Sequence, residues 1–172
     1  LAWRRWGITL PFGYAVGAIR TPDRPAVVDE RGALSFGDIE TRTTRLANGL
    51  KKQGVRAGDR VGVLCRNHHG LIETILACGK FGADVVLLNT GLAGGQLHTV
   101  LEQQRVRLLI SDEEFAEHPI GSVPRVLAWT DGTTQETTLE YLTASSPNDR
   151  LPRPKRASAL IVLTSGTTGS PK

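Results

Sequence analysis

The sequence contains no methionine and only two cysteines, and aromatic residues make up 5% of its 172 positions. Cys65 and Cys78 lack metal-ligand spacing, so we expect reduced thiols in the core of a cytoplasmic protein. The absence of methionine indicates a natural start that is missing or unconventional. No apolar run is long enough to cross a bilayer, and 40% hydrophobic and 22% charged residues are typical of a soluble globular protein.

A long block of one charge is also lacking. The net charge of +4 is spread along the chain, which argues against binding to nucleic acid. Near the start, two arginines lie between the tryptophans of residues 3–6, before an apolar stretch that Pro11 and Gly13 interrupt. These interruptions do not fit an export signal, so we expect a loosely packed segment. A weak contact with a membrane surface is the alternative.

The strongest pattern is a loop rich in glycine and hydroxyl residues, which follows an apolar run at residues 159–163. The run predicts a buried β-strand. In the loop, glycine lets backbone N–H groups approach an anion, while hydroxyl and ammonium groups add hydrogen-bond donors. The loop residues are Thr164, Ser165, Gly166, Thr167, Thr168, Gly169, Ser170, Pro171 and Lys172. This set predicts a site for a polyphosphate.

The loop is not a Walker A motif. That motif places Gly-Lys before Ser or Thr, whereas Pro171 precedes Lys172 here. Proline also disfavours a helical conformation at Ser170. A flexible turn without a ligand is one alternative, and a phosphate-binding module of another kind, such as a small kinase, is a second.

The nine loop residues resemble, without a gap, the phosphate-loop signature of the adenylate-forming superfamily. That superfamily includes acyl-CoA synthetases, adenylation domains of peptide synthetases and luciferases. The segments 33–39 and 54–64 also resemble its early part. The resemblance covers residues 19–111 and the loop, and it is weaker over 112–157.

The resemblance implies two half-reactions. A carboxylate attacks the α-phosphorus of ATP to give an acyl-adenylate and pyrophosphate, and the thiol of coenzyme A then displaces AMP. Lys172 is implied as the catalytic residue that stabilises negative charge, and Thr164 as a ligand of Mg²⁺. The residues implied in binding ATP are Thr164, Ser165, Gly166, Thr167, Thr168, Gly169 and Lys172.

The stretch Asn89, Thr90 and Gly91 resembles acyl-CoA synthetases of the fatty-acid type. Peptide-synthetase adenylation domains usually carry an aspartate and a Tyr-Pro pair there. The resemblance therefore implies a fatty acid, ATP and coenzyme A as substrates. A turn that closes a strand is the structural alternative for this stretch. For the function, another adenylate-forming enzyme and a non-catalytic remnant that binds a partner are the alternatives.

Apolar runs alternate with helical patterns through the middle of the chain. Strands are predicted at 61–65, 85–88 and 108–110, and helices at 71–81 and 97–104. Such alternation predicts an α/β fold whose mostly parallel sheet is flanked by helices and joined by right-handed crossovers. The resemblance implies the N-terminal part of the large domain of an acyl-adenylate synthetase.

An antiparallel hairpin is predicted before this region, with strands at 26–28 and 33–35. Ser35 is the expected N-cap of the next helix, and Asp38 completes a capping box. The apolar face of this helix consists of Ile39, Leu46, Ala47 and Leu50. Gly54 is expected at its C-terminal cap.

The pattern is weaker towards the end of the chain. A strand is predicted at 125–129, a turn at 131–134, and an exposed connector at 145–157 before the strand and phosphate loop at 159–172. The whole of 1–172 is interpreted as an incomplete N-terminal portion of an AMP-binding domain. The chain alone is therefore expected to be inactive and poorly stable, with the apolar residues of its last strand largely uncovered.

Two adjacent histidines, His68 and His69, follow the predicted strand at 61–65, at the edge where open α/β sheets bind ligands. We expect neutral residues at a helix start, with a ligand site as the alternative. His98 and His118 are isolated and receive no role. Because no cysteine or carboxylate is clustered with these histidines in the sequence, a structural zinc site is not expected.

Overall fold

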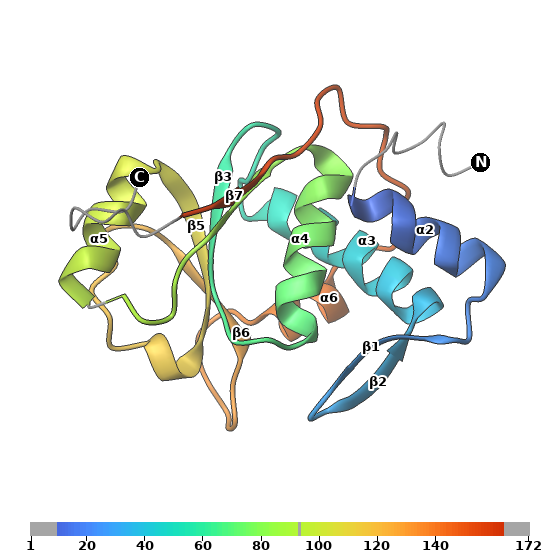
Figure 1. Ribbon diagram of the computed structural model, residues 1–172, viewed down its shortest axis with the longest axis horizontal. Helices are drawn as coiled ribbons and strands as arrows, with labels where there is room; N and C mark the ends of the chain where they lie inside the picture. Colours follow the sequence, from blue (N-terminus) through green and yellow to red (C-terminus); the bar gives the residue numbers. More distant parts are fainter. Residues whose placement is uncertain (1–9, 93, 164–172) are drawn as a thin grey trace.

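The computed structural model describes residues 10–92 and 94–163 (Figure 1). Its central sheet has five parallel strands in the order β6–β5–β3–β4–β7. The strands are β3 (Arg60–Leu64), β4 (Asp84–Leu87), β5 (Val106–Asp112), β6 (Arg125–Trp129) and β7 (Leu160–Val162). The predicted α/β fold with a parallel sheet is confirmed.

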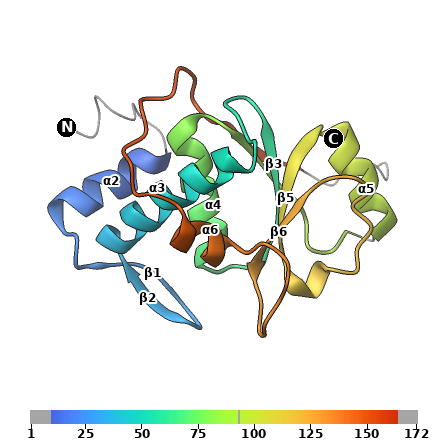
Figure 2. The ribbon, with the colours of Figure 1, turned by 180° about the vertical axis from the view of Figure 1, so that it is seen from behind.

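Helices cover both faces of the sheet, as Figures 1 and 2 show. One face carries α3 (Phe36–Lys52), α4 (His69–Phe81) and α6 (Leu139–Ser145), with α2 (Leu10–Arg20) packed on α3 and α4; the opposite face carries α5 (Gly94–Gln103). Buried side chains form one apolar cluster on each face. Strands that are buried on both faces read as continuous apolar runs, which is why the sequence predicts them well.

The hairpin and the helix cap are confirmed. Strands β1 (Pro25–Asp29) and β2 (Gly32–Ser35) pair antiparallel. The Oγ of Ser35 accepts from the N–H of Asp38 at 3.1 Å, and the N–H of Ser35 donates to the Asp38 carboxylate at 2.9 Å. The four apolar residues predicted to share a face of α3 are fully buried. Gly54, just beyond the end of α3, has a φ of 85°, a conformation that glycine adopts without strain.

The N-terminal segment was expected to be loosely packed. This expectation is wrong for residues 10–12, because they belong to the packed helix α2. Its contacts depend on two glycines. Gly17 lies against the ring of Phe36, and a Cβ added to Gly79 would come 2.6 Å from Pro11. These close approaches between helices are not visible as a local pattern in the sequence. The tryptophans and arginines of residues 3–6 lie outside the described residues.

Helix α6 is a second element that the weak pattern after β5 did not predict. Thr138 caps its N-terminus, and Leu139 and Leu142 are buried against the core. Residues 146–157 then cross to β7 without regular structure, and most of them are exposed. Leu151 is the exception that matters, because it is only 4% exposed and belongs to the core. The connector is therefore packed onto the domain at this point.

Strand β7 forms one edge of the described sheet. Leu160 and Val162 are 41% and 61% exposed, so the prediction of uncovered apolar residues is confirmed for these two. It is wrong for Ile161 and Leu163, which pack against the apolar cluster beneath α5. Alternating side chains of a strand point to opposite faces, and only one face of β7 has a partner layer in the described residues.

Candidate functional site

The predicted phosphate loop, residues 164–172, lies outside the described residues, so the roles assigned to it stay predictions. The structure does describe the strand that leads to it. β7 pairs with β4 in parallel, with Leu160 opposite Val85 and Val162 opposite Leu87. Both strands therefore end at the same edge of the sheet, the edge at which open α/β sheets bind ligands.

Residues 89–91, from which the sequence analysis inferred the substrate class, lie at this edge, just after β4. The Oδ1 of Asn89 accepts a hydrogen bond from the N–H of Gly91 at 2.9 Å. This is an Asx turn, in which an asparagine side chain closes its own backbone. The structural alternative for Asn89, a turn that closes a strand, is thus confirmed, and it accounts for this side chain without any substrate.

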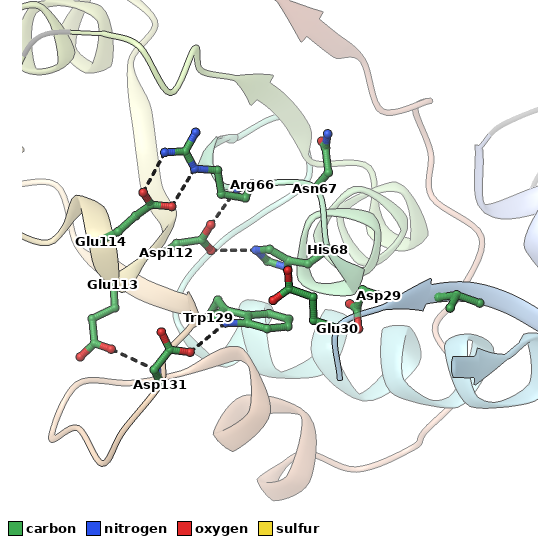
Figure 3. Close-up of a pocket in the computed structure, with 11 residues that line it drawn as sticks. Asp29, Glu30, Arg66, Asn67, His68, Asp112, Glu113, Glu114, Trp129 and Asp131 are labelled. Carbon is green, nitrogen blue, oxygen red and sulfur yellow. Dashed lines mark hydrogen bonds and ion pairs between the residues drawn. The ribbon is translucent and has the colours of Figure 1, made fainter. Parts of the chain in front are cut away.

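A cavity of about 400 Å³ opens at the same carboxyl edge, but beyond β3, β5 and β6 (Figure 3). The sheet order places these strands on the side away from β7. The cavity is lined by Val28, Asp29, Glu30, Arg66, Asn67, His68, Asp112, Glu113, Glu114, Trp129 and Asp131. The loop between β3 and α4 and the β1–β2 hairpin supply much of its wall.

His68 is the N-cap of α4 and is hydrogen-bonded through both ring nitrogens. Its Nδ1 accepts from the N–H of Gly70 at 3.1 Å, so the proton of the ring is on Nε2, which donates to Asp112 Oδ1 at 2.8 Å. The other oxygen of Asp112 accepts from the N–H of Arg66 at 2.7 Å. The ring of Trp129 lies 4.8 Å from that of His68. His68 is therefore the N-cap of α4, a residue at a helix start as the sequence predicted.

The structure corrects one premise about metals, because it brings Cys65, His68 and Asp112 within 4.8 Å of one another through their potential ligand atoms. Their hydrogen bonds nevertheless do not fit a metal. An ion at Nε2 would need the lone pair there and would move the proton to Nδ1, against the N–H of Gly70. Burial, and then the charge of Asp112, raises the pKa of the Cys65 thiol, whose Sγ is 3.8 Å from the carbonyl oxygen of Ile110.

His69 lies in a different environment, between carboxylates. Its Nδ1 is 2.6 Å from Asp29 Oδ2, and its Nε2 is 3.7 Å from Glu140 Oε1. Glu140, and then Asp29, raise the pKa of His69 above its ordinary value of 6.5, although burial opposes them. His69, and then Arg42, lower the pKa of Glu140 to about 2, although burial opposes them. His69 is the first residue of α4, at a helix start as the sequence predicted, and its carboxylate neighbours favour the imidazolium form.

The cavity is acidic although the chain has a net charge of +4. Six of its eleven lining residues are Asp or Glu, and its one lining cation, Arg66, is paired with Glu114 at 2.7 and 2.8 Å. Figure 3 shows the Arg66 guanidinium pointing to Glu114. Such a wall repels a carboxylate or a polyphosphate. The cavity is therefore poorly suited to an anionic ligand.

Sequence reasoning missed the partners of the two histidines, namely Asp29, Asp112 and Glu140, and the ring of Trp129. One signal was available for two of them. Asp112 and Trp129 are the last residues of β5 and β6, and the carboxyl ends of parallel strands gather at one edge. Asp29 and Glu140 reach His69 from separate elements, and no local spacing indicates that contact.

Comparison with known proteins agrees with this geometry. The sequence pattern of the AMP-binding enzyme family matches residues 15–172. The chain belongs to this family. A feruloyl-CoA synthase from Amycolatopsis sp. is 37% identical over 154 residues, which cover 88% of this chain and 30% of that protein. A medium/long-chain-fatty-acid–CoA/3-oxocholest-4-en-26-oate–CoA ligase from Mycobacterium tuberculosis is 28% identical over 172 residues, covering 92% and 31%.

A solved structure shares the fold. O-succinylbenzoate coenzyme A synthetase from Bacillus subtilis, in complex with AMP, superposes with a TM-score of 0.75 at 26% identity. The match covers 92% of this chain and 40% of that chain. Of the two curated relatives, the feruloyl-CoA synthase and the Mycobacterium tuberculosis ligase, the chain spans about 30% of the length. None of the described helices is long and apolar enough to cross a membrane.

Proposed function

We propose that this chain is the N-terminal part of an ATP-dependent acyl-CoA synthetase. One observation carries the proposal. In a chain of the AMP-binding family, a loop of glycine, hydroxyl residues and Lys172 directly follows β7, a strand that ends at the ligand-binding edge of a parallel sheet. The cavity at the carboxyl ends of β3, β5 and β6 is acidic, so the carboxyl ends of β4 and β7 are the better place for anionic substrates.

The first half-reaction joins a carboxylate oxygen to the α-phosphorus of ATP while the bond from that phosphorus to pyrophosphate breaks. Negative charge then grows on the leaving pyrophosphate. The loop N–H groups, its hydroxyls and the ammonium of Lys172 stabilise this charge. Thr164 is the proposed Mg²⁺ ligand, and Mg²⁺ would supply further charge neutralisation. In the second half-reaction the coenzyme A thiol attacks the acyl carbonyl and releases AMP.

The proposed acid is a fatty or other hydrophobic carboxylic acid. The motivation is the stretch Asn89 to Gly91, which resembles fatty-acyl-CoA synthetases more than adenylation domains for amino acids. The relatives described above carry names for feruloyl, succinylbenzoate and fatty-acid substrates, and none of these is an amino acid. A cytoplasmic location belongs to the same proposal, because both cysteines are free thiols.

The test is carboxylate-dependent ATP–pyrophosphate exchange. The chain is extended by the segment that follows the loop in the Amycolatopsis feruloyl-CoA synthase, and fatty, aromatic and amino acids are compared. Lys172→Ala should lower the exchange rate about 100-fold, as removal of one charge-stabilising donor does in other enzymes. Lys155→Ala, which removes an exposed lysine of the connector, serves as the control. Equal rates in the two variants contradict the role of Lys172, and a preference for amino acids contradicts the substrate class.

A further inference from the structure

The strand that carries the loop has little of its own to fix its position. β7 is three residues long, lies at the sheet edge, and is paired with β4 alone among the described strands. Leu160 and Val162 are exposed, so burial selects its register mainly through Ile161 and the following Leu163. Register is weakly specified where few side chains of a strand are buried, and a slip of one residue turns every side chain to the other face.

A cluster of polar contacts holds the chain immediately before β7. Asp84, the first residue of β4, accepts from the N–H of Ala159 at 2.8 Å through Oδ1. The same carboxylate receives both terminal nitrogens of Arg156, at 3.0 Å on Oδ1 and 3.1 Å on Oδ2. This fork of two parallel bonds fixes orientation as well as distance. Ser158 Oγ donates to the carbonyl oxygen of Ala83 beside it.

The anchor for these contacts is itself rigid. Arg156 also donates to the carbonyl oxygen of Gly82 at 3.0 Å, and that oxygen accepts from the N–H of Gly58 at 2.9 Å. The N–H of Asp84 donates to the carbonyl oxygen of Asp59 at 2.8 Å. Residues 82–84 are therefore tied to the turn before β3, in the middle of the sheet. Asp84 is only 8% exposed, which protects its contacts from competing water.

We propose that Asp84 and Arg156 form a clamp that sets the register of β7 and thereby positions the phosphate loop for ATP. Ala159 lies five residues before Thr164, and a strand rises about 3.3 Å per residue. A slip of one residue at the clamp would move the loop by about that distance, whereas a shift of about 1 Å can lower catalysis 100-fold. Both are positioning residues and need not touch substrate. The clamp follows from the described contacts, and only its link to ATP rests on the proposed function.

The variants are Asp84→Asn, which keeps the shape and turns an amide towards Arg156, and Arg156→Lys, which keeps the charge and loses the fork. A matched control exists at the opposite edge of the sheet, where Arg125 grips Glu136 at 3.0 and 2.8 Å. Each pair has one mostly buried and one partly exposed side chain, in reversed roles. Asp84 is 11% and Arg156 43% exposed, whereas Arg125 is 16% and Glu136 41% exposed. Glu136→Gln changes the more exposed partner of its pair, so it is the matched control for Arg156→Lys, and it does not touch β7.

Hydrogen exchange of the 172-residue chain tests the clamp itself. Segment 159–163 should exchange at least tenfold faster in both clamp variants, while segment 125–129 is unchanged. The melting temperature of Arg156→Lys should match that of Glu136→Gln. Unchanged exchange at 159–163 overturns the clamp. Equal acceleration in every strand also overturns it, because Asp84 would then act on overall stability alone.

Steady-state kinetics of the extended protein test the consequence for ATP. The clamp variants should raise the KM for ATP or lower kcat at least tenfold at saturating carboxylate, and Glu136→Gln should change neither. Faster exchange at 159–163 with unaltered kinetics contradicts the positioning role. If the extended wild-type protein shows no ATP–pyrophosphate exchange, the proposed function fails. The hydrogen-exchange data on the 172-residue chain still decide whether the clamp exists.

Discussion

Arg42 offers the sharpest test of how the helical layer is held together. Its guanidinium donates to both carboxylate oxygens of Glu73, the second at 3.2 Å, and also to Glu140. The Glu73 side chain is 1% exposed, whereas Arg42 is 22% exposed. Arg42→Met would therefore leave a carboxylate buried between α3 and α4 without the partner that compensates its desolvation.

Removing one partner of a buried ion pair destabilises a protein by about 3–5 kcal/mol. For a domain of this size each kcal/mol lowers the melting temperature by about 2–4 °C, so the expected loss is roughly 6–20 °C. The double variant Arg42→Met/Glu73→Met should recover most of this loss, because two apolar side chains of similar volume need no compensation. Thermal and urea unfolding of the 172-residue chain measure both effects.

The control is Arg66→Met, which breaks the pair with Glu114, whose side chains are 59% and 46% exposed. Exposed pairs contribute about 0–1 kcal/mol, so this variant should melt within a few degrees of the wild type. The reasoning is refuted if Arg42→Met and Arg66→Met lose the same stability. It is also refuted if the double variant is as unstable as Arg42→Met.

Three further predictions concern the His69–Glu140 pair, the capping box at Ser35 and the exposed residues of β7. The pKa of His69 is raised, so the stability that its charged form contributes is present below pH 6.5 and is lost as pH rises through the raised pKa. The pKa of Glu140 is lowered, so the stability that its carboxylate contributes is present above pH 4.5 and is lost as pH falls towards about 2. His69→Asn should flatten both slopes of unfolding free energy against pH. Ser35→Ala removes the capping box and should cost about 0.5–2 kcal/mol in urea unfolding. Leu160→Lys/Val162→Lys should reduce binding of hydrophobic dyes without lowering the melting temperature, because both side chains are exposed; a lower melting temperature would show that they are packed.

The sequence predicted the elements whose signal is local. The capping box at Ser35, the buried face of α3 and the apolar strands β3, β4 and β5 all follow from spacing of residue types within one element. Helices α2 and α6 were missed for the opposite reason. The packing of α2 depends on Gly17 and Gly79 admitting a neighbouring side chain, and that of α6 on a core built from distant strands.

By itself, the sequence determined the family and predicted a polyphosphate ligand, because nine consecutive residues carry the donors and the charge that a polyphosphate requires. Tertiary structure alone decided which charges meet. Asp29 and Glu140 converge on His69 from a hairpin and a helix that are far apart along the chain, and Asp84 meets Arg156 across 72 residues. The order of the strands in the sheet places the acidic cavity at the carboxyl ends of β3, β5 and β6, away from the carboxyl ends of β4 and β7. Electrostatic interactions depend on distance in space and not on separation along the chain. The sequence therefore shows which residues are charged but not which of them form pairs.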